Sequence, residues 1–289
     1  MLPAMVRKPS IVIVGAGNLG SALAVSLHRA GYGIRAIVAH SRGKSLQKAQ
    51  VLAKQVGARA QVGVEGIEAG VIWICVPDAA ISWVAESLAL TLRAHPMVAL
   101  HSSGALSSDE VDALRKRRAS VASVHPLMTF VHGSRPSLAG VPFAIEGDMA
   151  AVRTARRIVR NLGGRPYSIR KQDKAAYHAW GSFASPLFTA LLATSEQVAT
   201  LAGLGRNSAR QRMIPILRQT LANYASFGAA GAFSGPLIRG DVDTVRRHLG
   251  VLRKLPKVRD VYLALAHSAL ESLPTRDKSR LQKALRSTD

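Results

Sequence analysis

The sequence predicts an α/β domain with a doubly wound, mainly parallel sheet over residues 1–170, followed by an all-α domain over residues 171–289. Up to about residue 170, short β-rich segments alternate with amphipathic helical segments, as in a parallel sheet with crossover helices. After Ile169, apolar residues recur at helical spacing and no convincing β-rich segment follows. A chain of 289 residues is long enough to form two hydrophobic cores.

The first half divides into strands and helices at its turn residues. Gly31, Gly57 and Gly163 lie where three helices should end, and glycine adopts the left-handed C-cap conformation most readily. The expected strands are IVIV (11–14), IRAIVA (34–39), VIWICV (71–76), MVALHS (97–102), SVASVHP (120–126), PFAIEG (142–147) and PYSI (166–169), and the expected helices span 18–30, 45–56, 79–92, 107–118 and 149–162.

The second half is expected to contain helices interrupted by prolines. A long helix over 172–202 should bend at Pro186, because proline lacks the backbone N–H and clashes with the preceding turn. Pro215 predicts a second kink and Pro256 a helix boundary. The segment AAGAFSGPLIRGD, residues 229–241, is expected to be non-helical.

The composition restricts the compartment and the partners. With a single cysteine, Cys75, the chain forms no internal disulfide and no cysteine-based zinc site, which favours the cytoplasm. The N-terminus predicts no secretion signal, and Asp78 and Glu86 interrupt the most apolar stretch, so we expect no membrane span. The net charge of +22 is spread along the chain, which favours solvated helix faces over a nucleic-acid partner.

The motif GAGNLG follows the first strand directly and opens a helix. Gly15, Gly17 and Gly20 have the spacing at which glycines permit a tight turn, a close approach to a pyrophosphate and close helix packing. Asn18 and Leu19 lie within the same turn. The sequence therefore predicts a dinucleotide site, although a glycine turn without a ligand is the alternative.

The end of the second strand indicates which dinucleotide binds. NAD sites commonly place an acidic residue there, whereas this chain has no acidic residue before Glu65. His40, Ser41 and Arg42 occupy this place, and a guanidinium suits a 2′-phosphate. We therefore expect NADP(H), with Lys44 close by; alternatively, Arg42 only solvates a loop.

Three further strand ends carry candidate residues. Val76, Pro77 and Asp78 are expected beside the nicotinamide ribose, unless Asp78 is an ordinary N-cap. Ser102 and Ser103 offer hydroxyls to the cofactor and the substrate, unless they stabilise a turn.

The third strand end carries His125, which precedes Pro126. Its imidazole is suited to handling the proton that accompanies hydride transfer. The alternative is a hydrogen-bonded histidine beneath a loop. Cys75 is expected to be a small apolar residue rather than a nucleophile.

The helical half adds a polar helix face and a basic insert. Lys174, His178 and Ser185 recur at spacings of four and seven, with Tyr177 and Ser182 beside them. Such a face predicts a cleft, or else side chains that satisfy one another or line an interface. In the insert, Arg239 is a candidate clamp for a substrate carboxylate, and Asp241 a candidate helix cap.

Several motifs together resemble a known domain pair. In order they are GAGNLG, CVPD, HSSGALS, HPLMTF, PFAIEGD, YHAW and GPLIRGDVDTV, and they look like proteins that join a Rossmann-like domain to domain of unknown function 2520. These are similar to pyrroline-5-carboxylate reductase, ketopantoate reductase, 6-phosphogluconate dehydrogenase and prephenate dehydrogenase. The resemblance implies an N-terminal NADP-binding domain, a helical domain that often dimerises, and a substrate cleft between the two.

The resemblance also bears on individual residues. Prephenate dehydrogenases carry a serine at a strand end and a histidine in an HP motif that contact substrate, and Ser102 or Ser103 and His125 occupy comparable places. In one respect this chain departs from the pattern: Pro186 follows Ser185 where the related proteins often have Asn. An amide contact at that position is therefore not expected.

These observations lead to one hypothesis and two alternatives. The hypothesis is an NADP(H)-dependent oxidoreductase that transfers a hydride to or from a small anionic metabolite bound between the domains of a homodimer. His125 or His178 would handle the proton, Ser103 would orient the substrate and Arg239 would anchor its charge. The alternatives are a non-catalytic NADP(H)-responsive binding protein and a prephenate-like dehydrogenase.

Overall fold

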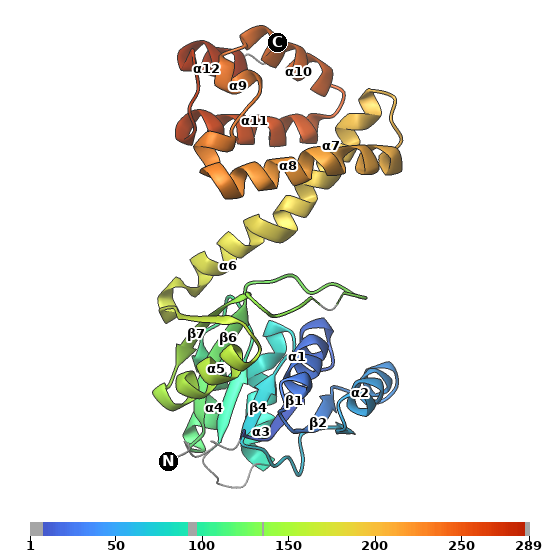
Figure 1. Ribbon diagram of the computed structural model, residues 1–289, viewed down its shortest axis with the longest axis vertical. Coiled ribbons are helices and arrows are strands. Elements are labelled where there is room, and N and C mark those ends of the chain that lie inside the picture. Colours follow the sequence, from blue (N-terminus) through green and yellow to red (C-terminus); the bar gives the residue numbers. More distant parts are fainter. Residues whose placement is uncertain (1–7, 92–96, 135, 287–289) are drawn as a thin grey trace. The chain divides into compact units, whose positions relative to one another are not determined.

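The computed structural model describes residues 8–91, 97–134 and 136–286, which form two compact units (Figure 1). Unit 1 extends to Ser185 and unit 2 begins at Pro186. The strands all lie before Ile169, as expected, but the first helix of the second half belongs to unit 1. This helix, α6 (Lys174–Ser182), stays with the sheet because Lys174 and Tyr177 hydrogen-bond to residues at the strand ends.

Unit 1 is built on an eight-stranded sheet of order β3-β2-β1-β4-β5-β6-β7-β8. All neighbouring strands are parallel except β6 and β7. The strand order reverses at β1, which pairs with both β2 and β4. The strands are β1 (Ile11–Val14), β2 (Ile34–Ala39), β3 (Arg59–Val62), β4 (Val71–Ile74), β5 (Val98–His101), β6 (Ser120–Pro126), β7 (Pro142–Gly147) and β8 (Arg165–Ser168).

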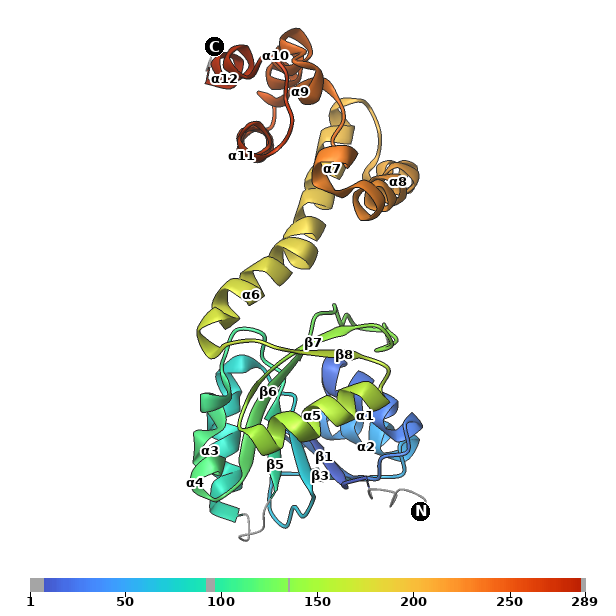
Figure 2. The same cartoon turned by 60° about the vertical axis from the view of Figure 1, so that its left-hand side comes forward.

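Helices cover both faces of this sheet (Figure 2). One core joins the sheet to α1 (Asn18–Arg29), α2 (Lys44–Gln55) and α5 (Met149–Asn161). The other core joins it to α3 (Ile81–Thr91) and α4 (Asp112–Lys116). Every residue of β1 and β4 is buried, as expected for central strands of a parallel sheet covered on both faces.

The predicted elements of unit 1 are confirmed with two differences. Gly31, Gly57 and Gly163 have φ of +77°, +64° and +76° just after α1, α2 and α5, as their expected C-cap positions require. The sequence analysis missed the edge strand β3, because RAQV is short, half polar and without a long apolar run. The helix expected at 107–118 is a 3-10 turn, Ser108–Val111, followed by the short α4.

Unit 2 consists of helices. They are α7 (Phe188–Leu201), α8 (Arg206–Ala232), α9 (Pro236–Arg239), α10 (Val242–Leu252), α11 (Pro256–Ser272) and α12 (Lys278–Arg286). A core of α10, α11 and α12 residues includes Val245, Leu270 and Leu281.

Proline and glycine explain the helix breaks. The helix expected at 172–202 is interrupted by a π-helical segment, Phe183–Leu187, which contains Pro186. Pro215 lies within α8, and the non-helical backbone of that helix is at Gly228, with φ of +68°. The segment 229–241 was expected to be non-helical; this is wrong in part, because α8 continues to Ala232 and α9 forms after it. Pro256 begins α11, as expected.

Two helices of unit 2 leave apolar side chains exposed. The structure describes α7 and α8 along their whole length, and each has a single buried residue, Glu196 in α7 and Ala209 in α8. Ile214, Leu221 and Tyr224 are 38%, 56% and 60% exposed, and their spacing places them on one face of α8. In the described part of the chain no single helix is long and apolar enough to span a membrane; the sharply bent pair 171–201 and 206–239 reaches that criterion only together.

Candidate active site

The glycine turn lies at the carboxyl end of β1, where the strand order reverses. Gly15 has φ of +108°, and a Cβ at this position would lie 2.5 Å from the Cys75 carbonyl oxygen. A Cβ on Gly20 would lie 2.0 Å from the Gly15 oxygen, so α1 packs on the turn only without a side chain there. No described atom lies within 4 Å of a Cβ built on Gly17. Gly15 and Gly20 thus shape the fold, whereas Gly17 faces open space at the start of α1.

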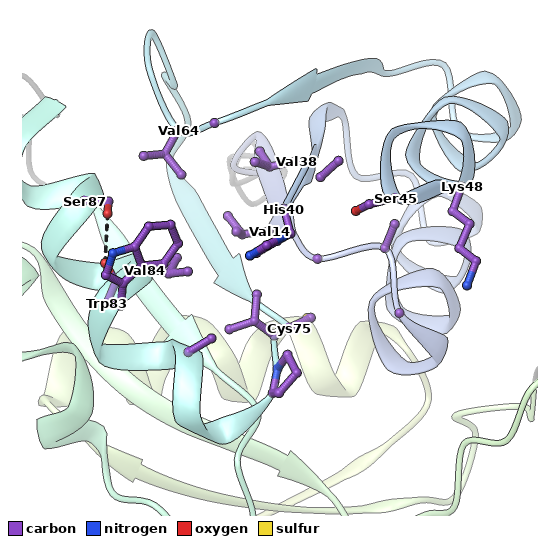
Figure 3. A pocket seen from close by; sticks show the side chains of 18 of the residues that line it. Val14, Val38, His40, Ser45, Lys48, Val64, Cys75, Trp83, Val84 and Ser87 are labelled. Carbon is purple, nitrogen blue, oxygen red and sulfur yellow. Dashed lines mark hydrogen bonds between the residues drawn. The ribbon is translucent and has the colours of Figure 1, made fainter. Parts of the chain in front are cut away.

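A cavity of about 660 Å³ adjoins this turn (Figure 3). Trp83 and Val84 of α3 form an apolar wall together with Val64, and the His40 ring lies 6.5 Å from the Trp83 ring. The opposite part of the wall is basic, because Lys44 and Lys48 of α2 contribute to it. The remaining lining includes Val14, Gly15, Ala16, Gly17, Val38, Ala39, Ser45, Gly63, Glu65, Cys75, Val76, Pro77, Ala80 and Ser87.

The residues of this cavity fit a dinucleotide phosphate. A heteroaromatic base suits the apolar wall beside Trp83, and a pyrophosphate suits the space at Gly17, where the first N–H groups of α1 have no partner within the helix. The two lysines supply positive charge for a further phosphate. This set of residues fits a nicotinamide dinucleotide.

The cofactor residues predicted from the sequence fall into three groups. Gly15, Gly17, His40, Val76 and Pro77 line the cavity. Leu19 and Gly20 pack inside the fold, whereas Asn18 donates through Nδ2 to the Phe130 oxygen at 3.1 Å and so holds the segment after β6. Ser41 and Arg42 are exposed and are not among the described residues that line it.

The sequence analysis missed most of the lining residues, including Ser45, Lys48 and Trp83. Lys48 could have been found, because Lys44 and Lys48 lie one helical turn apart on α2. That spacing was a usable signal, because both side chains must then leave the same helix face. Trp83 had no such signal, since an aromatic residue on a helix is more often part of the core.

The two serines after β5 hold a turn. Ser102 Oγ accepts a hydrogen bond from Trp73 Nε1 at 2.8 Å. Ser103 Oγ donates to Asp78 Oδ2 at 2.8 Å and accepts from the backbone N–H groups of Ala105 and Leu106 at 3.2 and 2.9 Å. The Ser103 hydroxyl is thus occupied within the fold, and its contact with a substrate stays a prediction. Asp78 likewise holds this turn, and it makes no side-chain cap.

His125, Tyr177 and His178 form a compact cluster around Gly104. His125 Nδ1 lies 2.8 Å from the Tyr177 hydroxyl, and the two rings are nearly perpendicular. The His178 ring centre lies 6.3 Å from that of His125. A Cβ on Gly104 would lie 2.6 Å from His178 Cδ2 and 2.9 Å from His125 Nε2, so only a residue without a side chain fits beside both imidazoles. Strand β6 and helix α6 thus bring together residues far apart in the sequence.

Burial keeps His125 and Tyr177 uncharged. Desolvation, together with smaller effects of the nearby Lys174 and His178, lowers the pKa of His125 to about 4. Desolvation also raises the pKa of Tyr177, aided by the Tyr167 hydroxyl. At neutral pH His125 is therefore a neutral imidazole, which has one donor and one acceptor nitrogen, and Tyr177 is a neutral phenol.

The polar face predicted on the next helix is confirmed in part. His178 joins the cluster, whereas Lys174 is only 1% exposed, in line with the alternative that some residues of this face satisfy one another. The Lys174 ammonium donates to the Ser103 oxygen at 2.9 Å and to Ser123 Oγ at 2.6 Å. Ser182 donates to the His178 oxygen within the helix, and Ser185 lies in the π-helical segment.

The remaining candidates belong to other elements. Arg239 ends α9 in unit 2 and stays a prediction as a substrate anchor. Asp241 caps α10 by accepting from Thr244 N at 3.0 Å, the alternative that the sequence left open. Burial raises the pKa of Cys75, in agreement with an apolar rather than a nucleophilic role. Within the described residues, no three His, Cys, Asp or Glu side chains are grouped to hold a metal ion.

Comparison with known sequences identifies two domains. A Rossmann-like domain matches residues 4–126, and the domain of unknown function 2520 matches residues 141–269. Both were expected from the motifs, and both are confirmed. No protein with a curated description matches the sequence.

Solved structures share the fold at low identity. A provisionally assigned NADP oxidoreductase from Bacteroides fragilis has a TM-score of 0.76 and 22% identity, over 90% of this chain and 97% of that one. An imine reductase from Pseudomonas sp. has a TM-score of 0.63 and 22% identity, over 97% and 100% of the two chains. A pyrroline-5-carboxylate reductase from Coxiella burnetii has a TM-score of 0.57 and 14% identity, over 97% and 100%.

The glycine turn makes a paired prediction. Gly20→Ala places a methyl group against the Gly15 carbonyl, so we expect the free energy of unfolding in urea to fall by about 2 kcal/mol or more. Gly17→Ala meets no described atom and has an allowed backbone, with φ of −72°, so we expect a loss below about 1 kcal/mol. Equal losses in the two variants would contradict this division between fold and ligand contact.

Proposed function

Because the chain carries a Rossmann-like domain followed by a domain of unknown function 2520, we propose that it is an oxidoreductase that uses NADP(H) to reduce or oxidise a small anionic metabolite. One observation carries this proposal. The cavity at Gly17 and the neutral His125–Tyr177 pair both lie at the carboxyl ends of strands in one sheet. In open α/β sheets this edge, near the point where the strand order reverses, is where ligands bind.

Different residues of unit 1 would bind different parts of the cofactor. The Gly15–Gly20 turn would hold the pyrophosphate, the wall of His40 and Trp83 the adenosine, and Val76 and Pro77 would lie toward the nicotinamide. When bound, NADP(H) supplies or accepts the hydride. The protein itself then has to bind and orient the substrate and to move one proton.

The histidine cluster is suited to moving that proton. A neutral imidazole accepts a proton at one nitrogen and gives one up at the other, and Tyr177 extends this path from His125 Nδ1. His178 also lies close to Gly104, so a second imidazole is available near His125.

The names of the structural neighbours suggest the reacting bond. The imine reductase and the pyrroline-5-carboxylate reductase share this fold, and we propose that the present chain also reduces a C=N or C=O bond. Such a reduction adds a hydride to carbon and a proton to nitrogen or oxygen, which matches a dinucleotide cavity combined with a proton-transfer cluster. Arg239 is our candidate for binding the substrate's carboxylate.

Turnover tests this proposal. Purified protein is incubated with NADPH and a panel of cyclic imines and 2-oxo acids, with and without carboxylates, and nicotinamide absorbance is followed. We expect turnover of an anionic member, and we expect His125→Gln to lower kcat/KM by about 10²- to 10³-fold, as for loss of a general acid or base.

The second histidine–tyrosine pair of the chain provides the control. His248 Nδ1 lies 3.2 Å from the Tyr262 hydroxyl in unit 2, so His248→Gln should leave turnover unchanged. Binding of NADPH without turnover of any compound would instead support the non-catalytic alternative. Turnover of cyclohexadienyl substrates would support the prephenate-like one.

The basic wall is the proposed origin of a preference for NADPH. Lys44 and Lys48 line the cavity, and both also border a second cavity of about 480 Å³ on the other side of Gly17. Arg42, the first candidate from the sequence, is exposed next to them. A 2′-phosphate near α2 would therefore meet two ammonium groups, with the guanidinium as a further partner.

Charge reversal separates these contributions. We expect Lys48→Glu to weaken NADPH binding about tenfold or more, corresponding to the loss of about 1.4 kcal/mol, while NADH binding changes little. Lys54→Glu, on α2 but outside the cavity lining, is the control. Fluorescence titration with both nucleotides measures the ratio. If Arg42→Asp alone changed the ratio, the guanidinium and not the lysines would select the cofactor.

The exposed apolar face of α8 is the proposed contact with a second copy of the chain. Soluble monomers rarely leave such a face open, and Ile214, Leu221 and Tyr224 follow one another along it. We expect light scattering to give the mass of a dimer and Leu221→Glu to give a monomer. Val251→Glu, at a 51% exposed site on α10, should leave the dimer intact. A monomeric native protein at all concentrations would refute this proposal.

A further inference from the structure

Lys174 is a buried cation at the first position of α6. Its side chain is 1% exposed, and its ammonium donates to the Ser103 carbonyl oxygen at 2.9 Å and to Ser123 Oγ at 2.6 Å. Ser123 Oγ in turn donates to the same carbonyl oxygen at 3.2 Å. One ammonium group therefore joins helix α6, strand β6 and the turn after β5.

These three elements are the ones that build the histidine cluster. Helix α6 carries Tyr177 and His178, strand β6 carries His125, and the turn carries Gly104, which lies close to both imidazoles. Tyr177 comes three residues and His178 four residues after Lys174, about one helical turn. Any shift of the ammonium relative to Ser103 would therefore change the distance between the rings.

The charges around Lys174 come from several elements. Asp78 and Glu146 raise its pKa, but burial has the larger effect and lowers it to about 8. Glu146, from β7, is itself occupied by Ser108, whose N and Oγ donate to it at 2.6 and 2.9 Å. His101 and His125 face the same ammonium, which lowers the pKa of each. Both histidines are therefore neutral at neutral pH, while Lys174 is mostly charged.

Stability alone gives little reason to bury this charge. The two oxygens that the ammonium contacts are neutral, and desolvating an ammonium costs several kcal/mol, which an apolar side chain of similar size would avoid. A lysine can instead fix how the three elements meet, because its ammonium donates to the Ser103 oxygen and to Ser123 Oγ.

We propose that Lys174 is the positioning residue of the His125–Tyr177–His178 cluster, holding α6 against the turn at Ser103 and the strand at Ser123. This inference rests on the proposed function for the chemistry of the cluster, but not for its geometry. Lys174 contacts neither substrate nor cofactor cavity, and it acts through the histidines that it places.

Histidine titration tests the proposal without nucleotide or substrate. The imidazole resonances of wild type, Lys174→Met and Lys174→Arg are followed by NMR from pH 3.5 to 8.5, with His125→Gln and His178→Gln for assignment. We expect Lys174→Met to raise the pKa of His125 from about 4 toward 6.5, because the cation and the tight packing are both lost. Lys174→Arg keeps the charge and should hold the His125 pKa closer to the native value.

Two further variants keep the test decisive. Lys171→Met removes an exposed lysine of the preceding turn, whose ammonium bonds Asp109, and should leave every histidine unchanged. If Lys174→Met does not fold, Ser123→Ala removes one of the two oxygens that Lys174 bonds, and it should move the His125 pKa in the same direction by less. Unchanged titration of His125 and His178 in folded Lys174→Met and Ser123→Ala would overturn the proposal.

Kinetics separate this proposal from the proposed function. If the protein reduces a member of the panel, Lys174→Met should lower kcat at least tenfold while the NADPH Kd stays within about twofold, since Lys174 does not line the cavity. A fall in NADPH affinity equal to the fall in kcat would mean general loss of structure and would count against a positioning role. Should no substrate be found, the NMR result still decides whether Lys174 places the histidines.

Discussion

The close approach of the Gly104 backbone to two imidazole rings is the constraint on which the candidate site depends. Gly104 has no side chain, so α6 can approach β6 closely enough for Tyr177 to reach His125 and for Lys174 to reach the turn. Hydrogen bonds connect the same turn to Trp73 of β4 and to Asp78, which begins the short 3-10 segment after β4. Because Pro77 and Val76 border the nucleotide cavity, one short turn links the cavity to the histidine cluster.

The polar groups of unit 1 fall into two classes. Ser102, Ser103, His101 and Glu146 are buried and hydrogen-bonded within the fold, which fixes the strand ends. The groups left open are the turn at Gly17 and the lysines of α2, and the histidine cluster keeps a neutral imidazole beside them. A site that binds anions and moves a proton needs both classes, because the groups that contact a ligand keep their positions only if the surrounding strand ends are fixed.

Much of the fold was readable in the sequence because strands of a parallel sheet carry strong apolar runs and their helices end at glycines. IVIV and VIWI are fully buried strands, and Gly31, Gly57 and Gly163 end the helices as expected. The edge strand β3 escaped prediction because an edge needs no apolar run. The domain boundary differed for a related reason, since nothing in the spacing of Lys174 shows that its ammonium is buried against a turn 71 residues earlier.

The site was predicted less well than the fold, and the reason is physical. Sequence spacing shows which residues share a strand end or a helix face, so the glycine turn, His125 and His178 were found. It does not show how a polar group is satisfied, so it did not predict that Ser103 and Lys174 hydrogen-bond within the fold. Sequence spacing also did not show that Lys48 rather than Arg42 lines the cavity, because this depends on the direction of helix α2.

The position of Trp83 has an optical consequence. It is 60% exposed on the cavity wall beside His40, whereas Trp73 is fully buried. Tryptophan emits light at the wavelengths that a reduced nicotinamide absorbs, and a base covering the indole changes its surroundings. Trp83 therefore makes the empty and filled cavities distinguishable by their emission, so the protein carries its own label for nucleotide occupancy.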